Sequence, residues 1–257
     1  MPGTGVPTLS VAIVVLNEEE RLRACLESVV WADEIVVVDA GSSDKTMAIA
    51  REFTDRAMFR AWDGYGAQKN FVLGQCRGDW LLSVDADERV PDALREEIQA
   101  TIRSERREVG YYLPRRNVFE GRWVRHGGLY PDWQLRLFRR GRGAFLERAV
   151  HESVRVDGPT GRFSAALVHE SYRGIGDAVA RLNRYSDLAA ADLARAGRGG
   201  SLWDLLARPA WRFAGMYLLR AGFLDGWRGL VLAALHAHYV FLRAAKVRER
   251  RAGTGMA

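Results

Sequence analysis

The sequence predicts an α/β protein built on a doubly wound sheet, with a helical extension at its C-terminus. Residues 11–15 and 35–38 form short, continuous apolar runs rich in valine and isoleucine. Runs this short and β-branched are typical of strands buried on both faces, as in a parallel sheet. Between them, apolar residues recur at helical spacing from Leu22 to Val29. The two runs and the helix therefore form a βαβ unit, and the same alternation continues over the first hundred residues.

The later elements follow in order along the chain. After the second strand, the turn DAGSSDKT predicts a helix over residues 45–53, because its serines and aspartate are good helix caps. Further helices are expected over residues 67–76 and in VPDALREEIQATIRS, with a strand over residues 81–84 between them. From Gly110 the segments become short, aromatic and partly alternating, which indicates an α+β stretch added to the same sheet. Helical periodicity returns near Asp177 and is interrupted by glycines at residues 196–201.

Length and composition limit the classes of protein that fit. A chain of 257 residues suits one large domain with an extension, and we expect residues 1–175 to form the sheet domain and residues 176–257 the extension. The net charge of +6 suits nucleic acid, anionic lipid or nucleotide phosphates as partners. Cys25 and Cys76 lie in apolar helical segments, so buried thiols are expected rather than a disulfide or a zinc site. The N-terminal segment does not resemble a signal peptide, so a cytoplasmic location is expected.

Acidic side chains follow three of the predicted strands. Glu18 comes after the first strand, Asp39 after the second, and Asp85 and Asp87 after the strand at residues 81–84. A doubly wound sheet brings these strand ends to one edge, where ligands bind. Any one of these acids is equally well explained as turn chemistry, but together they predict a binding site.

The chemistry of that site is constrained by what the first turn lacks. It reads LNEEERL, without the glycines of a dinucleotide-binding loop, and the sequence has no Walker loop. A divalent cation held by carboxylates is the alternative way to bind phosphates. Asp85 and Asp87 would share one face if the chain stays extended there. We therefore expect the positive partner of these acids to be a metal ion carrying a diphosphate.

Three motifs in this order resemble the inverting family 2 glycosyltransferases with the GT-A fold: SVAIVVLNEEERL, EIVVVDAGSSDKT and GDWLLSVDADE. Later segments are similar to a narrower subgroup, the bacterial lipopolysaccharide-core enzymes that add glucose to the heptose region. These segments are YPDWQLRLFRRG, AVHESV and FLDGWRGLVLAALHAHYVFLR. The resemblance covers roughly residues 8–248 and implies a Rossmann-like mixed sheet, a nucleotide-sugar donor and Mg²⁺ or Mn²⁺ as cofactor.

The resemblance also implies roles for individual residues. The uracil or ribose would contact Leu16, Asn17 and Glu18, and the base would also bind Asp39. Asp85 would face the ribose and sugar and is a candidate metal ligand, while Asp87 would bind the metal on the diphosphate. Lys69 and Asn70 would lie beside the nucleotide, although for Lys69 a solvated helix charge is an equal alternative.

Inverting transfer needs one general base to take the proton of the acceptor hydroxyl. Asp132, Gln134 and Arg136 alternate with apolar residues, which predicts that they share a polar face toward a cleft, with Asp132 as base and the other two contacting phosphate or acceptor. A half-exposed edge strand with ordinary surface charges is the alternative. Glu152 is the rival base, and His151 beside it is a candidate ligand of the metal or diphosphate. His169 could act like His151, but a lone histidine is more often structural.

The C-terminal helices combine apolar stripes with tryptophan, tyrosine and arginine. This composition suits a membrane interface and an acceptor at the inner leaflet, whereas the uncharged run at residues 229–242 is too short to span a bilayer. Amphipathic helices that close the core or a dimer are the alternative.

The expected function is metal-dependent, inverting transfer of a sugar, with UDP-glucose as the expected donor, to a cell-envelope glycolipid such as the lipopolysaccharide inner core. Transfer of another nucleotide sugar, or transfer to a lipid-linked carrier, is the alternative within this class. A basic nucleic-acid-binding protein is a different class, disfavoured because lysine and arginine are dispersed and no recognition module is evident. An inactive scaffold is disfavoured by the acids present at all three strand ends.

Overall fold

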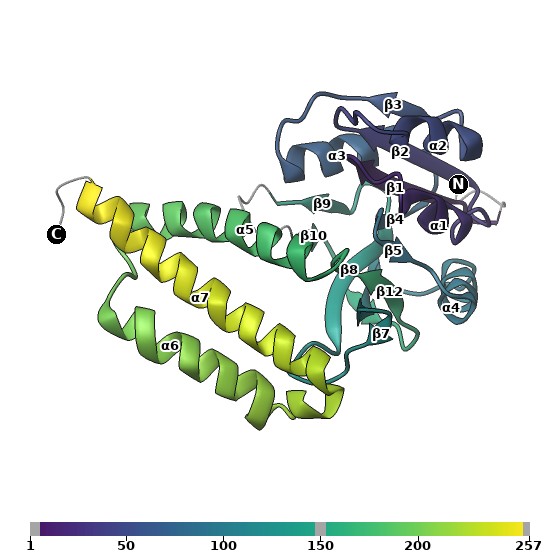
Figure 1. Cartoon of the computed structure of the whole chain (residues 1–257). Helices are drawn as coiled ribbons and strands as arrows, with labels where there is room; N and C mark the ends of the chain where they lie inside the picture. Colours follow the sequence, from purple (N-terminus) through teal and green to yellow (C-terminus); the bar gives the residue numbers. More distant parts are fainter. Residues whose placement is uncertain (1–5, 147–152, 254–257) are drawn as a thin grey trace. The chain divides into compact units, whose positions relative to one another are not determined.

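The computed structural model describes residues 6–146 and 153–253, and the described chain forms two compact units (Figure 1). Unit 1 comprises Met1–Arg115 and Asp132–His169, and unit 2 comprises Arg116–Pro131 and Glu170–Ala257. No sequence pattern predicted that residues 116–131 group with the C-terminal helices. The boundary expected after residue 175 stays a prediction.

The centre of unit 1 is a parallel sheet in which β1 (Leu9–Val15) lies between β2 (Glu34–Asp39) and β4 (Trp80–Asp85). The short strand β3 (Ala57–Phe59) extends the sheet beyond β2, also in parallel. All three central strands are almost entirely buried, as their apolar runs predict.

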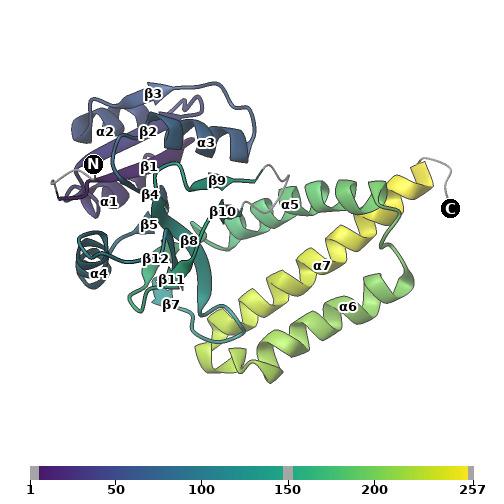
Figure 2. The ribbon, with the colours of Figure 1, turned by 180° about the vertical axis from the view of Figure 1, so that it is seen from behind.

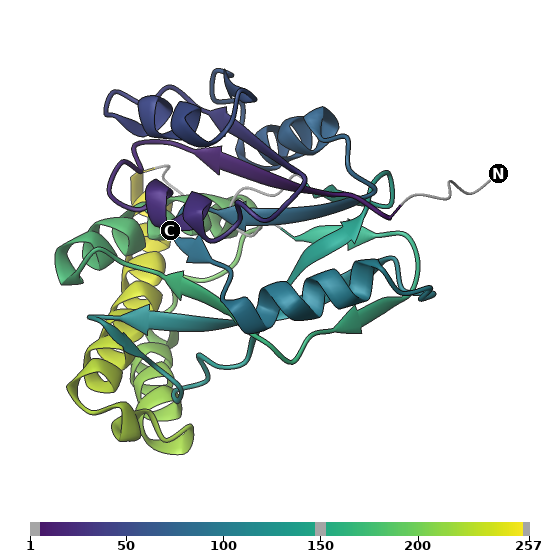
Figure 3. The ribbon, with the colours of Figure 1, turned by 90° about the vertical axis from the view of Figure 1, so that its right-hand side faces the viewer.

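Helices cover both faces of this sheet, because alternate residues of each strand point to opposite sides. On one face, Leu9, Val11 and Ile13 pack with residues of α1 (Leu22–Glu27), α2 (Thr46–Phe53) and α4 (Asp92–Ile102). On the other, Ala12 and its neighbours pack with α3 (Tyr65–Gln75). Figure 3 shows α4 lying along its face of the sheet. The doubly wound sheet is confirmed, and so are the buried thiols of Cys25 and Cys76.

The sheet continues through antiparallel strands, so it is mixed. β8 (Asp132–Arg139) pairs with β4 on one side and β6 (Gly110–Phe119) on the other, so β8 is an interior strand and not an edge. Beyond β6 the order continues to β12 (Leu167–Glu170) and β5 (Glu88–Arg89). The remaining short strands are β7 (Arg122–Trp123), β9 (Gly143–Phe145), β10 (Val154–Val156) and β11 (Thr160–Arg162).

Unit 2 is dominated by three helices, α5 (Ile175–Arg195), α6 (Leu202–Ala214) and α7 (Trp227–Gly253). α7 packs against both of the others, and Figure 2 shows it between them. The expected break between α5 and α6 is confirmed. Ser201 caps the N-terminus of α6 in a capping box, in which Ser201 and Asp204 each accept the other's backbone N–H. A π-helical turn (η1, Gly215–Leu219) and a 3-10 turn (η2, Gly222–Asp225) connect α6 to α7.

The segment Trp227–Ala252 of α7 is, within the described residues, the one helix long and apolar enough to cross a membrane. The uncharged run at residues 229–242 is by itself too short to span a bilayer, but a membrane span tolerates a few charges, and the longer segment includes them. Core helices of soluble proteins meet the same criteria of length and composition. Of the apolar window of α7, 28% is buried.

Candidate active site

The acids that end the central strands lie level with one another. Val14 of β1 pairs with Asp85 of β4, and Val15 pairs with Asp39 of β2. The three strand ends therefore form one edge of the sheet, as the sequence predicted. β4 ends at Asp85, and Ala86 and Asp87 form a turn. The extended conformation that would have placed Asp85 and Asp87 on one face is thus not adopted.

The loops after β1 and β2 are held together by side chains. Asn17 adopts a left-handed backbone conformation, which asparagine tolerates better than most residues. Its backbone N–H donates to Ser42 Oγ over 2.8 Å, and its side-chain oxygen accepts from Ser43 N–H over 2.9 Å. The backbone N–H of Glu18 donates to Thr46 Oγ1 over 2.8 Å. These bonds fix the loop that was expected to contact a nucleotide.

Asp39 is buried and accepts hydrogen bonds from the backbone N–H and the hydroxyl of Ser42. In this arrangement it caps the loop that follows β2. Leu16, by contrast, is 47% exposed at the end of β1, so its apolar side chain is available to a ligand.

Lys69 of α3 binds Asp85, with 2.6 Å between Nζ and Oδ1. Its side chain is 12% exposed and lies over the ring of Phe145, so it is not a solvated helix charge. The other carboxylate oxygen of Asp85 pairs with Arg136 of β8. Asp85 therefore has two protein cations as partners, and the metal ion expected beside these acids stays a prediction.

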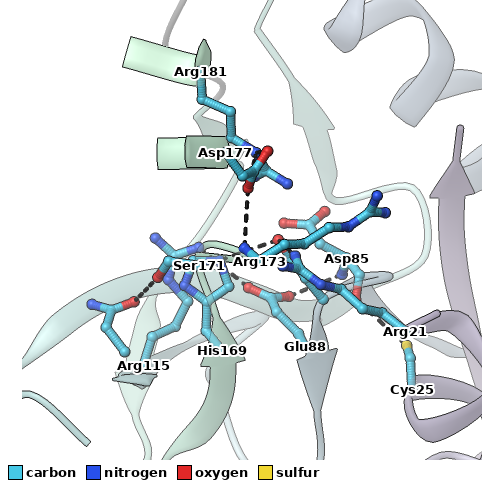
Figure 4. A network of polar contacts seen from close by, with 12 residues as sticks. Arg21, Cys25, Asp85, Glu88, Arg115, His169, Ser171, Arg173, Asp177 and Arg181 are labelled. Carbon is cyan, nitrogen blue, oxygen red and sulfur yellow. Dashed lines mark hydrogen bonds and ion pairs between the residues drawn. The ribbon is translucent and has the colours of Figure 1, made fainter. Parts of the chain in front are cut away.

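Glu88 connects this pair to the next one. It is completely buried, and its Oε1 lies 2.7 Å from Arg136 and 3.3 Å from Arg115 of β6. Its Oε2 accepts the backbone N–H of Asp85 over 2.9 Å. Figure 4 shows Asp85, Glu88 and Arg115 in this network. One buried carboxylate thus holds two guanidinium groups and the end of β4.

Arg115 extends the network to the predicted base. Its Nε and one terminal nitrogen donate to Asp132 Oδ2 over 2.9 and 2.6 Å, and Gln134 donates to Oδ1 over 2.7 Å. Arg115 and Asp132 are cross-strand partners in β6 and β8, so the pair is built into the sheet register. Asp132, Gln134 and Arg136 thus belong to one polar network, as their alternation suggested.

The charges in this network stabilise one another. Burial by itself would raise the pKa of Asp85, but Arg136 and Lys69 more than offset that and hold it well below its usual value. Burial would likewise lower the pKa of Arg136, but Asp85 and Glu88 raise it above its usual value. Arg136 and Lys69 therefore keep Asp85 ionised in a largely buried site.

Asp87 has a separate set of neighbours. Its Oδ2 lies 3.6 Å from Arg21 at the start of α1 and 3.5 Å from His169 Nε2 of β12. His169 pairs in register with Glu88, which places it beside the turn after β4. All three side chains are largely buried, and Figure 4 labels Arg21 and His169.

Asn70 makes contacts of a different kind. Its amide nitrogen donates to the carbonyl of Phe145 over 2.9 Å, and its oxygen accepts the N–H of the same residue over 2.8 Å. Asn70 therefore connects α3 to β9, because its amide group bonds both backbone groups of Phe145, as the backbone of a neighbouring strand would.

We expect Asn70→Ala to lower the free energy of unfolding by about 1 to 3 kcal/mol, because it leaves two backbone groups of Phe145 without a partner. Urea denaturation followed by circular dichroism measures this. Gln75→Ala on the same helix is the control and should change stability much less. Equal stability of the two variants would contradict the structural role of Asn70.

Two predicted site residues, His151 and Glu152, lie outside the described residues. The site residues predicted from the sequence do not include Arg115, Glu88 or Arg21. Glu88 directly follows the two aspartates, so its place in the motif was a signal. The place of Arg115 in the site follows from its pairing with Asp132, and that pairing can be known only from the register of β6 with β8.

The mixed sheet and the acids at its strand ends define the class: the chain has the fold of a GT-A glycosyltransferase. Two structures of TarS from S. aureus, one in complex with UDP-GlcNAc, match it with TM-scores of 0.50 and 0.52. Each match covers 96% of this chain and 92% of that one, at 18% and 16% identity, and therefore supports the fold alone.

The family model for "Glycosyl transferase family 2" matches residues 10–162, and the chain belongs to this family. It is 34% identical to the lipopolysaccharide core biosynthesis glycosyltransferase LpsC of Rhizobium meliloti, over 95% of this chain and 93% of the relative. It is also 30% identical to an uncharacterized glycosyltransferase of Rickettsia typhi, over 94% of this chain and 87% of the relative. The chain is a glycosyltransferase, as expected from its sequence motifs.

Proposed function

We propose that this glycosyltransferase is metal-dependent and inverting, and that it transfers glucose from UDP-glucose to a cell-envelope glycolipid such as the lipopolysaccharide inner core. The observation that carries the proposal is the grouping of Asp85, Asp87, Lys69 and Arg136 at the end of β4. The acceptor class rests on the end-to-end similarity to LpsC.

The donor would lie along the edge formed by the strand ends. Leu16, Asn17 and Glu18 would contact the uridine, and Asp39 would present its carboxylate to the base from the fixed loop after β2. Asp85 would face the ribose and sugar. Lys69 and Arg136 are the cations nearest to Asp85, so they suit the negative charge of the diphosphate.

Mg²⁺ and Mn²⁺ fit the residues around Asp87. Mg²⁺ commonly uses one or two protein ligands and completes its shell with water and substrate phosphate. Asp87 and His169 offer a carboxylate and an imidazole 3.5 Å apart, and no cluster of three or more such ligands exists among the described residues. We assign the metal to Asp87 and His169, since Asp85 already faces Lys69 and Arg136. Bound there, the metal would stabilise the charge of the leaving diphosphate.

Asp132 is the proposed base. Its carboxylate is held in place by Arg115 and Gln134 and is 28% exposed, so an acceptor hydroxyl has access to it. A carboxylate has about four lone-pair positions, which leaves capacity for the acceptor proton. Glu152 is the alternative base, with His151 beside it.

A glycolipid acceptor is anchored in a membrane, so we also propose that the protein works in the cytoplasm at the inner membrane face. The exposed apolar side chains of α6 and α7 support a peripheral contact.

Calorimetric titration of UDP tests the donor site directly. We expect binding with Mn²⁺ present, and at least about tenfold weaker binding in EDTA or after Asp87→Ala. Asp157→Ala, at an exposed position, is the control and should bind like the wild type. Equal binding with and without metal would overturn the metal assignment. No UDP binding at all would redirect the donor search to other nucleotides, and a panel that includes UDP-glucose and UDP-GlcNAc separates the sugars.

A further inference from the structure

Unit 2 contains a cavity of about 420 Å³ that the proposed reaction does not use. It lies among α6, η1 and α7, and its walls combine four arginines with apolar side chains. The arginines are Arg208, Arg212, Arg220 and Arg243. The apolar walls come from Trp211, Met216, Leu219 and Val240. No acidic residue lines it, so the cavity is chemically suited to an anion attached to an apolar group.

Most of these arginines lack an acidic partner. Arg208 pairs with Asp204 over 2.8 Å. In the described part of the chain, no carboxylate lies within ion-pair distance of Arg212, Arg220 or Arg243. Three like charges around one cavity repel one another, and an anion bound among them would remove that cost.

The helix that forms one wall also leaves its apolar side chains in solvent. None of the residues of α6 is buried. Four of its large apolar side chains are 65 to 70% exposed: Leu202, Trp203, Leu206 and Trp211. Leu218 and Leu219 of η1 are exposed to a similar degree. An exposed apolar surface of this kind marks an interaction site, and tryptophan beside arginine is typical of the boundary between lipid headgroups and acyl chains.

The backbone around the cavity is also irregular. Pro209 lies inside α6, where it removes one helical hydrogen bond, and α6 passes into the π-helical turn that supplies Met216 and Leu219 to the wall. Short π-helical turns are frequent at functional sites.

We propose that this surface binds the membrane, with the phosphate of an anionic phospholipid in the arginine cavity and the exposed side chains of α6 and η1 among the lipid chains. The charge complementarity selects lipid over an apolar protein partner, because three arginines without acidic partners would be costly in a closed protein interface. This inference specifies the membrane contact within the proposed function. Its test measures lipid binding alone, so it can fail while the donor site stands.

The experiment is vesicle sedimentation with the full chain. Wild type should bind vesicles of phosphatidylcholine mixed with phosphatidylglycerol at least about tenfold more tightly than phosphatidylcholine alone. The double variant Arg212→Gln, Arg220→Gln should lose about tenfold or more of that binding. The pair Arg51→Gln, Arg77→Gln removes the same charge from exposed positions of unit 1 and should change binding much less.

Trp203→Ala should weaken binding to both kinds of vesicle. Circular dichroism checks that each variant is folded, and UDP titration checks the donor site independently.

Three results would overturn the proposal. The first is equal loss of vesicle binding in the two arginine pairs, which would reduce the effect to net charge. The second is binding of inorganic phosphate to wild type but not to the Arg212, Arg220 variant, with vesicle binding unchanged, which would assign the cavity to a soluble anion. The third is a dimer in light scattering that Trp203→Ala dissociates, without vesicle binding, which would assign the surface to a second copy of the chain.

Discussion

Glu88→Gln is expected to destabilise unit 1 by about 3 to 5 kcal/mol, although it changes a single atom of a side chain that no ligand can reach. Glu88 is completely buried between Arg136 and Arg115 and also accepts the backbone N–H of Asp85. Glutamine has one acceptor oxygen, so its amide group must face either a guanidinium or that N–H. The substitution also removes the negative charge with which the guanidinium groups of Arg115 and Arg136 are paired.

Urea denaturation of the wild type and the variant measures this loss. Glu97→Gln is the matched control, because Glu97 also accepts several hydrogen bonds, from Ser164 and Ala165, but has no arginine partner among the described ion pairs. We expect it to lose about 1 kcal/mol. A Glu88 variant as stable as the Glu97 variant would show that the network does not depend on its central charge.

Glu88→Gln should also weaken UDP binding, since Glu88 holds both the end of β4 and the arginine that faces Asp85. A variant that is destabilised but binds UDP as tightly as wild type would separate the structural role of Glu88 from the donor site.

The central sheet could be predicted from sequence because its strands are buried on both faces and contain little besides apolar residues. The level ends of β1, β2 and β4 follow from the same parallel arrangement, so Asp39 and Asp85 were found correctly at one edge. Such features depend on local composition and on general rules of topology.

The partners of the acids could not be predicted, because they come from antiparallel strands distant in sequence. Arg115 reaches Asp132 only through the register of β6 with β8, and His169 reaches Asp87 only through the pairing of β12 with β5. A shift of one residue in either register would turn these side chains to the opposite face. The turn at Ala86 was also unpredicted, and it separates Asp87 from Asp85.

Asp132→Asn should reduce the rate of sugar transfer by about 10² to 10⁴ while leaving UDP affinity nearly unchanged, if Asp132 is the general base. The fold should tolerate the change. The asparagine oxygen can still accept both hydrogen bonds from Arg115, and Gln134 can rotate its amide to accept from the new NH₂ group. Transfer from UDP-glucose to lipopolysaccharide with a truncated inner core, measured as UDP release, gives the rate. Asp157→Asn, which alters an exposed aspartate paired with Arg142, is the control and should transfer at the wild-type rate.

Glu152→Gln, measured in parallel, distinguishes the two candidate bases. The loss of a base and the loss of a binding residue change different kinetic parameters. Loss of the base lowers kcat and removes the acidic limb of the pH profile, whereas loss of a residue that only binds donor or acceptor raises KM and leaves that limb in place. A slow Glu152 variant beside a fully active Asp132 variant would transfer the role to Glu152. Asp132 would then be a partner that holds Arg115 in the buried network, and Asp132→Ala, which removes the acceptor oxygens, should lower stability without lowering the rate.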